Sequence, residues 1–382
     1  MKKILVIHNT YRNIGGEDIA VTNEIKLLER QYDVHTLYFS NKEVNFLSQF
    51  LSFLLNKDTQ SMKKLTDTIN SFNPDLAYVH NTWFRASLGV FKILKSKNIK
   101  TIVKLHNFRY DCTKGYFIQC NKEKGQICRK CGREKFKFQI FNKYFTESYL
   151  KSFLVNRYGK KYFKILKKDI DRVLVLTKFH KNYLINLGFK EEKINVFQNY
   201  IQIEKDLSNV SENYIVYAGR VSHEKGIATL IEAFLASNLK DTKLKIVGDG
   251  PYLNESMNKY NTNLIEFCGQ KTNYETLEII KKSKAVITAT KLFEGQPTLL
   301  CEASSFGVPS IFPDTGGISE FFPSNYELMY DRNEIRNLTE KINLLENNEY
   351  IEDLGIKNKE YLKSNLNEDR LIDIFNKIIN EL

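Results

Sequence analysis

Residues 214–234, YIVYAGRVSHEKGIATLIEAF, decide the fold. The run YIVYAG carries no charged residue, which is typical of a strand buried on both faces of a parallel sheet. A turn that contains Arg220 and Lys225 follows, and in GIATLIEAF the apolar residues recur at helical spacing. A buried strand, a short turn and a helix form the repeating unit of α/β proteins.

The same unit recurs in both halves of the chain. Apolar runs that stop at a polar turn alternate with helical patterns such as 17–30 and 273–282. The three runs of the first half each end in His-Asn, and one of them carries Lys104 inside it. We therefore predict an α/β fold with two Rossmann-like, doubly wound domains. The predicted strands are KKILVIHN (2–9), DLAYVHN (75–81), TIVKLHN (101–107), YIVYAG (214–219), LKIVGDG (244–250), LIEFCG (264–269), KAVITAT (284–290) and VPSIF (308–312).

The stretch 198–213 is the best candidate for a linker between the two domains. We expect an N-terminal domain at 1–200, a C-terminal domain at 201–365, and a helix at 366–382 that packs back on the N-terminal domain. Ligands of such sheets bind beyond the carboxyl ends of the strands. Two domains facing across a cleft would therefore bring their strand-end residues to one site.

The composition is that of a globular protein. The 382 residues are enough for two cores, with 42% apolar and 27% charged residues. The apolar run of the start, MKKILVIHN, is shorter than a secretory signal needs, and no segment reaches the roughly 18 apolar residues of a membrane span. We expect a cytoplasmic protein whose cysteines are thiols or metal ligands.

Glycines and basic residues follow two of the predicted strands. Gly15 and Gly16 open the first helix, whose N-terminus could receive a phosphate, although an ordinary tight turn explains the same pair. Arg220 and Lys225 could hold a diphosphate and stabilise it as it leaves. Two solvated charges are the ordinary alternative in a chain with 57 lysines and arginines.

Two carboxylates flank a proline in LFEGQPTLLCEA, residues 292–303. Glu294 lies in the turn after a predicted strand, and Glu302 lies on the second turn of a helix whose first position would be Pro297. Carboxylates accept hydrogen bonds from sugar hydroxyls. A surface acid and a helix-face charge are the ordinary alternatives.

Taken in order, these features resemble the retaining glycosyltransferases of family 4, which have the GT-B architecture of two Rossmann-like domains. No single motif is specific, but the ordered set spans most of the chain. It comprises the pair Gly15 and Gly16, GRVSHEKG at 219–226, VGDGP at 247–251, the E-x7-E pair Glu294 and Glu302, and TGGISE at 315–320.

The resemblance implies a nucleotide-sugar donor, UDP- or GDP-linked, held mainly by the C-terminal domain without a catalytic metal. Arg220 and Lys225 would bind its diphosphate, Glu302 its ribose, and Glu294 the transferred sugar. The family's more familiar EGFG is EGQP here, so Gln296 would alter the sugar preference. Other donor-binding residues would be Gly15, Gly16, Gly248, Gly295, Pro297, Thr298 and Leu299, and His106 would lie close to the reacting sugar.

The implied activity is transfer of a hexose to a glycan or polyprenyl-linked acceptor during assembly of a cell-surface polysaccharide or lipopolysaccharide. Two other functions remain open from the residues alone. One is a nucleotide-sugar epimerase of the same architecture, and the other is a zinc-knuckle protein that binds nucleic acid.

Four of the six cysteines lie in one loop, which we predict at 106–135. Two of them form a C-x2-C pair, and four thiolates could close a tetrahedral structural zinc site. A reduced thiol cluster is the alternative. The predicted ligands are Cys112, Cys120, Cys128 and Cys131.

The positive charge is concentrated in residues 133–168, which contain eleven basic and two acidic side chains interleaved with aromatic residues. In 45–56, NFLSQFLSFLLN, one helical face is apolar, as in an interfacial helix, although it could also pack on its own domain. We expect an anionic membrane surface as a partner, at the inner face of the plasma membrane, and no nucleic acid.

Overall fold

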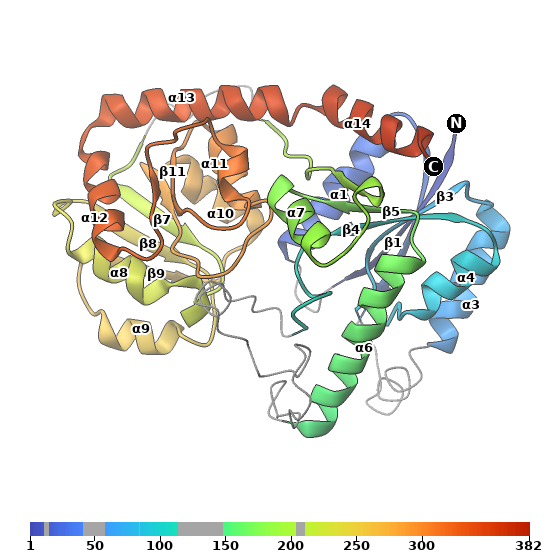
Figure 1. Cartoon of the computed structure of the whole chain (residues 1–382). Coiled ribbons are helices and arrows are strands. Elements are labelled where there is room, and N and C mark those ends of the chain that lie inside the picture. The colour runs from blue at the N-terminus through green and yellow to red at the C-terminus, as the bar shows by residue number, and fades with distance from the viewer. Residues whose placement is uncertain (11–14, 41–57, 84, 114–147, 204–210) are drawn as a thin grey trace. The chain divides into compact units, whose positions relative to one another are not determined.

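The computed structural model describes residues 1–10, 15–40, 58–83, 85–113, 148–203 and 211–382. These residues form two compact units (Figure 1). Unit 1 consists of the described residues of 1–113, 148–200 and 368–382, and unit 2 consists of those of 201–367. The predicted interfacial helix at 45–56 and most of the cysteine-rich loop lie outside the described residues.

Unit 1 is built on a six-stranded parallel sheet in the order β2-β1-β3-β4-β5-β6. Its central strands are continuous apolar runs because helices cover both faces, and β3 is buried along its whole length. Its strands are β1 (Lys3–Thr10), β2 (Asp33–Ser40), β3 (Leu76–Asn81), β4 (Lys100–Leu105), β5 (Arg172–Val175) and β6 (Ile194–Val196). Its helices are α1 (Gly16–Leu28), α3 (Thr59–Phe72), α4 (Gly89–Ser96), α6 (Tyr149–Lys168), α7 (Lys178–Asn186) and α14 (Glu368–Asn380).

Unit 2 is a second six-stranded parallel sheet, in the order β12-β11-β10-β7-β8-β9. Helix α8 packs with α12, whereas α11 packs with α10 and α13, so the helices form two layers. The strands are β7 (Tyr214–Ala218), β8 (Lys243–Val247), β9 (Ile265–Gly269), β10 (Ala285–Ile287), β11 (Ser310–Pro313) and β12 (Met329–Tyr330). The helices are α8 (Ile227–Leu235), α9 (Leu253–Lys259), α10 (Asn273–Lys281), α11 (Thr298–Ser305), α12 (Ile335–Asn343) and α13 (Asn348–Asn365).

Both sheets are doubly wound, which confirms the predicted fold class of two Rossmann-like domains. The strand order reverses between β1 and β3 in unit 1 and between β7 and β10 in unit 2. At such a reversal the loops leaving two neighbouring strands diverge and open a crevice at the carboxyl ends. The residues that follow β7 and β10 are therefore the first place to look for a binding site.

Helix α14 completes the core of unit 1. Its buried residues recur at helical spacing and pack against residues of the sheet and of α1. Phe375 is fully buried, with ring contacts to Tyr32, Tyr78 and Phe197. Burial of these apolar side chains stabilises the packing of α14 against unit 1.

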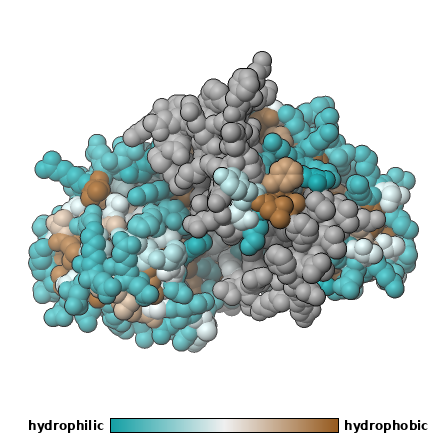
Figure 2. Space-filling model, turned by 90° about the horizontal axis from the view of Figure 1, so that it is seen from below, coloured by the Kyte–Doolittle hydropathy of each residue, from teal (hydrophilic) through white to brown (hydrophobic). Residues whose placement is uncertain are grey.

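On the face seen in Figure 2, most of the described residues are hydrophilic. Figure 2 shows hydrophobic residues at separate positions on one face rather than in a continuous belt. No helix within the described ranges combines the length and apolarity that a membrane crossing requires.

Candidate functional site

An ion pair joins the two loops at the strand reversal of unit 2. Lys225 ends a short 3-10 turn (His223–Lys225) after β7, and its Nζ lies 2.5 Å from Oε1 of Glu294 in the loop after β10. The hydroxyl of Thr290, which is buried, donates to the same carboxylate oxygen at 3.0 Å. Both charged side chains are more than a quarter exposed, so a ligand can reach them.

Gly226 holds these two loops together. It has a φ of +71°, and a Cβ there would lie 1.9 Å from the carbonyl oxygen of Ala289 in the loop after β10. Only glycine allows both the left-handed backbone and this approach. The backbone N–H of Lys291 donates to the carbonyl of Glu224 at 2.9 Å, which adds a direct bond between the loops.

A second glycine supports Glu294 from behind. Gly316 has a φ of +62°, and a Cβ there would lie 2.4 Å from the carbonyl oxygen of Glu294. That carbonyl also accepts the N–H of Gly317 at 3.0 Å. The motif TGGISE therefore sets the backbone of Glu294. The motif is visible in the sequence, and its two adjacent glycines are the signal for this role.

The loop after Glu294 leads into α11. Pro297 is the N-cap of this helix rather than its first residue, because its carbonyl already accepts the N–H groups of Leu300 and Cys301 at 2.9 and 3.0 Å. The side chain of Gln296 is buried. The first turn of α11 contains no acidic residue, and the partial positive charge of the helix N-terminus favours an anion.

Glu302 lies on the second turn of α11. Burial raises the pKa of its carboxyl group to about 7. Among the described residues, no hydrogen bond or ion pair holds this carboxylate, so desolvation acts without compensation. A buried carboxylate that gains hydroxyl donors from a ligand would recover the lost hydrogen bonds.

The other residues predicted in unit 2 lie at neighbouring strand ends. Arg220 is exposed just after β7, and its backbone carbonyl accepts the hydroxyl of Tyr217 at 2.8 Å. Gly248 follows β8, and its N–H donates to the carbonyl of Gly269 at 2.8 Å. Gly248 therefore has a structural role in addition to its predicted role in binding the donor. Thus the structure joins Lys225 directly to Glu294 and places Arg220 and Gly248 at the ends of β7 and β8.

In unit 1, two histidines meet at the carboxyl ends of β3 and β4. Nδ1 of His80 lies 3.0 Å from Nε2 of His106, and the rings stack. Burial lowers the pKa of both imidazoles well below the usual range, so both are neutral at physiological pH. One ring therefore donates and the other accepts. They border a cavity of about 20 Å³, which has room for about one water molecule.

The asparagines of the three His-Asn pairs shape the turns after the strands. Asn81 accepts the N–H of Trp83 at 2.9 Å, and Asn9 accepts that of Ala86 at 3.0 Å. Asn107 accepts the N–H of Arg109 at 3.0 Å. Asn81 and Asn107 thus satisfy the backbone that leaves their own strands, whereas Asn9 satisfies backbone in the segment that follows β3. Sequence reasoning noticed the repeat and did not predict the contact between its histidines.

The two glycines after β1 differ in their surroundings. Gly15 is the N-cap of α1, and its N–H donates to the carboxylate of Asp18 at 2.9 Å, which also bonds to His8. At Gly16, the first residue of α1, a Cβ would meet no atom of the described residues within 4 Å. The open backbone at Gly16 is therefore the one that a ligand could approach.

Of the predicted zinc ligands, only Cys112 belongs to the described part of the chain, where it is half-buried. The described residues contain no cluster of histidine, cysteine and acidic side chains suited to a metal ion. Cys120, Cys128 and Cys131 fall outside them, so the zinc site stays a prediction.

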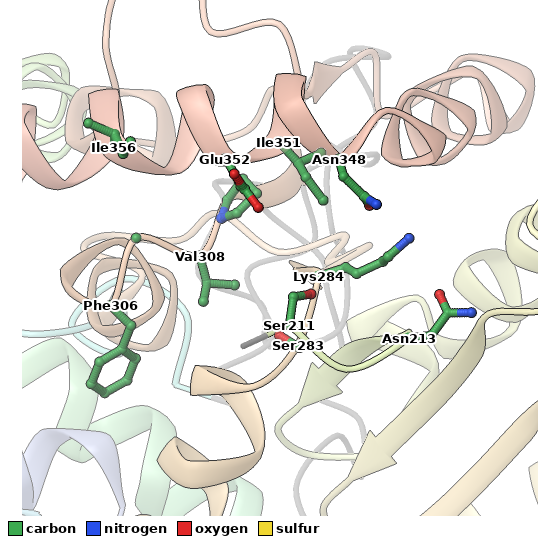
Figure 3. Close-up of a pocket in the computed structure, with 12 residues that line it drawn as sticks. Ser211, Asn213, Ser283, Lys284, Phe306, Val308, Asn348, Ile351, Glu352 and Ile356 are labelled. Carbon is green, nitrogen blue, oxygen red and sulfur yellow. The ribbon is translucent and has the colours of Figure 1, made fainter. Parts of the chain in front are cut away.

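Unit 2 also has a larger cavity, of about 630 Å³, at the opposite end of its strands. Asn213, Lys284 and Pro309, which directly precede β7, β10 and β11, line it. Figure 3 shows Asn348 and Ile351 projecting from α13 toward this end of the strands. The cavity therefore lies at the amino ends of the strands, where ligands of doubly wound sheets do not usually bind.

Comparison with known proteins agrees with this geometry. Residues 199–366 match the family model described as glycosyl transferases group 1. The chain is 27% identical over 184 residues to the amylovoran biosynthesis glycosyltransferase AmsD of Erwinia amylovora, covering 43% of this chain and 50% of that protein. It is 31% identical over 134 residues to the putative teichuronic acid biosynthesis glycosyltransferase TuaC of Bacillus subtilis, covering 35% and 33%. The matches thus span half or less of these relatives' length.

A structural relative covers the whole chain. The crystal structure of Alr3699/HepE from Anabaena, in complex with UDP and glucose, superposes with a TM-score of 0.68 at 13% identity and covers 100% of both chains. This similarity shows the GT-B fold. Together, the family match and the relatives support a transferase of the glycosyltransferase class.

Proposed function

We propose that this protein is a retaining glycosyltransferase that moves a hexose from a nucleotide-sugar donor to a glycan or polyprenyl-linked acceptor. The observation that carries the proposal is the Lys225–Glu294 ion pair at the strand reversal of unit 2. It lies within the segment that matches the glycosyltransferase family model. The relatives named for amylovoran and teichuronic acid biosynthesis support a role in polysaccharide assembly. We propose that this assembly serves the cell surface and takes place on the cytoplasmic side of the membrane.

In the proposed complex, unit 2 holds the donor. Lys225 and Arg220 bind the diphosphate, and the backbone from Gly295 to Leu299 receives phosphate or sugar oxygens at the start of α11. Glu302 accepts hydrogen bonds from the ribose, and Glu294 from the transferred sugar. UDP as the nucleotide is consistent with the UDP complex of the Anabaena protein.

Two residues of unit 1 also belong to the proposed donor site. Gly16 leaves room for a close approach of phosphate, and His106 offers a neutral ring nitrogen to the sugar. A neutral imidazole can donate or accept one hydrogen bond there without placing a second charge beside the diphosphate.

The chemistry needs no protein nucleophile. The bond from the anomeric carbon to the diphosphate oxygen breaks while the acceptor oxygen attacks from the same face, and the leaving diphosphate takes the acceptor's proton. Lys225 and Arg220 stabilise the negative charge that grows on the diphosphate, and the two glutamates position the sugar.

A thermal-shift screen of the full-length protein against UDP, GDP, ADP and their common sugar conjugates tests the donor site. We expect one base to raise Tm, because a ligand that binds only the folded state stabilises it. The shift should be lost in Glu302→Gln and kept in Glu278→Gln, a change of the same kind on α10 of the same unit. No shift with any nucleotide would contradict the proposal.

The raised pKa of Glu302 predicts a pH-dependent affinity for the nucleotide. Only the ionised carboxylate accepts two hydroxyl donors well, so Kd should rise as pH falls below about 7 and approach a tenfold weakening per pH unit. In Glu302→Gln this part of the pH dependence should vanish, whereas titration of the ligand's own phosphate affects both proteins alike. The measurement is isothermal titration calorimetry between pH 5.5 and 8.5. Parallel pH profiles for the two proteins would refute the role of Glu302.

A further inference from the structure

Helix α6 of unit 1 has two sharply different faces. One face packs into the unit through buried residues such as Leu154, Tyr158, Tyr162 and Leu166. The helix contains seven basic residues and no acidic one. The outward stripe, at spacings of three and four residues, consists of Leu150, Phe153, Arg157, Lys160, Lys161, Lys164 and Lys168.

The positive charges of this stripe are not neutralised within the described part of unit 1. No ion pair joins Arg157, Lys160, Lys161 or Lys164 to an acid there, whereas Lys95 of the neighbouring helix α4 pairs with an aspartate at 2.7 Å. Burial, with the nearby charges of Arg157 and Lys92, lowers the pKa of Lys161. Repulsion among these cations raises the free energy of the unbound protein, and an anionic partner relieves it.

The beginning of the same helix is apolar and exposed. Tyr149, Leu150 and Phe153 keep 56%, 54% and 51% of their surface accessible. In Figure 2, where the start of α6 comes toward the viewer, hydrophobic and hydrophilic residues stand together near the centre of the face. Large apolar side chains exposed beside a row of cations mark an interaction surface rather than an ordinary solvated helix.

We infer that the outward face of α6 binds the surface of an anionic lipid bilayer. Leu150 and Phe153 enter the boundary between headgroups and acyl chains, and the cations from Arg157 onward lie on lipid phosphates. Twenty helical residues form a stripe about 30 Å long, which suits a flat surface. Nucleic acid would use the cations and leave the apolar end exposed, so a bilayer accounts for more of the surface.

This inference goes beyond the proposed activity and does not depend on it. A glycosyltransferase with a polyprenyl-linked acceptor would benefit, since its acceptor lies in the same membrane. The binding itself requires neither donor nor acceptor, so it can be tested with the protein alone.

The test is co-sedimentation of the full-length protein with vesicles of phosphatidylglycerol and phosphatidylcholine at low salt. The variant replaces Arg157, Lys160, Lys161 and Lys164 with glutamine. It should lose at least about 100-fold in partitioning, since each well-placed cation strengthens binding about fivefold. The matched control removes four exposed lysines from four other elements, Lys63→Gln, Lys243→Gln, Lys363→Gln and Lys377→Gln, and should bind nearly as the unchanged protein does.

The apolar end is tested separately with Leu150→Ser and Phe153→Ser in one protein. The unchanged protein should keep part of its binding when salt screens the charges, and this salt-resistant part should disappear in the double variant. Three results would overturn the inference. They are no binding to anionic vesicles at low salt, equal losses in the α6 variant and the charge-matched control, and tight binding to an oligonucleotide without binding to vesicles.

Discussion

Replacement of Lys225 by alanine is expected to lower kcat for sugar transfer by about 100-fold or more while the protein stays folded. Lys225 bridges the loops after β7 and β10 through its 2.5 Å contact with Glu294. In the proposed reaction its charge stabilises the diphosphate as the bond to the sugar breaks. The effect should therefore appear in kcat more than in KM, since the interaction strengthens in the transition state.

The same unit offers a matched control for this experiment. Lys259 pairs with Glu232 at 3.1 Å, and both side chains are about half exposed. Lys259→Ala removes an ion pair of the same residue types away from the strand reversal and should leave turnover within about twofold, because exposed pairs contribute little. Glu294→Ala should match Lys225→Ala, and the double variant should lose little more, because the two residues act as a unit. Near-normal turnover by either single variant would contradict the assignment.

The largest effect on stability is expected for Lys104→Met. Lys104 is fully buried in β4, and its ammonium pairs with Glu24 of α1, whose carboxylate also accepts the hydroxyl of Tyr78. The ammonium also donates to the carbonyl of Gln198 at 3.3 Å and lies 4.5 Å from the ring of Phe197. Loss of the lysine leaves a carboxylate buried without a counter-charge, which costs about 3–5 kcal/mol.

The measurement is urea-induced unfolding of the full-length protein. The free energy of unfolding is taken from the transition whose midpoint the substitution shifts. Lys100→Met is the control, because Lys100 begins the same strand, is half exposed and lies 3.6 Å from Asp171. It should change the free energy of unfolding by less than about 1 kcal/mol. Adding Glu24→Met to Lys104→Met should restore most of the loss, since a buried ion pair is often replaceable by apolar side chains. A single variant as stable as the control would show that the pair is not needed.

This buried pair also belongs to the surroundings of the candidate site. Lys104 and His106 lie two residues apart, and both border the small cavity beside His80. The charge of Lys104 contributes to the lowered pKa of both imidazoles, and burial is the largest cause. A variant that keeps its fold but lacks this charge would thus alter the histidine pair as well as the core.

The sequence carried much of the information about the fold because burial leaves a local trace. YIVYAG and DLAYVHN could be identified as strands of parallel sheets, since both faces of such strands are covered and the apolar run is unbroken. The edge strand β2, with alternating buried and exposed residues, left a weaker trace and was not predicted. Pro297 was predicted one position too far into the helix because cap geometry depends on which carbonyl accepts the first hydrogen bonds.

The candidate site could be predicted only as separate residues. Lys225 and Glu294 stood out as charges at strand ends, but they are 69 positions apart, and their contact depends on β10 lying next to β7. The role of Gly316 behind Glu294 and the pairing of His80 with His106 likewise follow from neighbours that are distant in the chain. Local periodicity reports which residues are buried, and from this chain it revealed the class of fold and the loops of the candidate site. Which loops touch depends on strand order, and strand order is set by long-range packing that no short stretch of this sequence records.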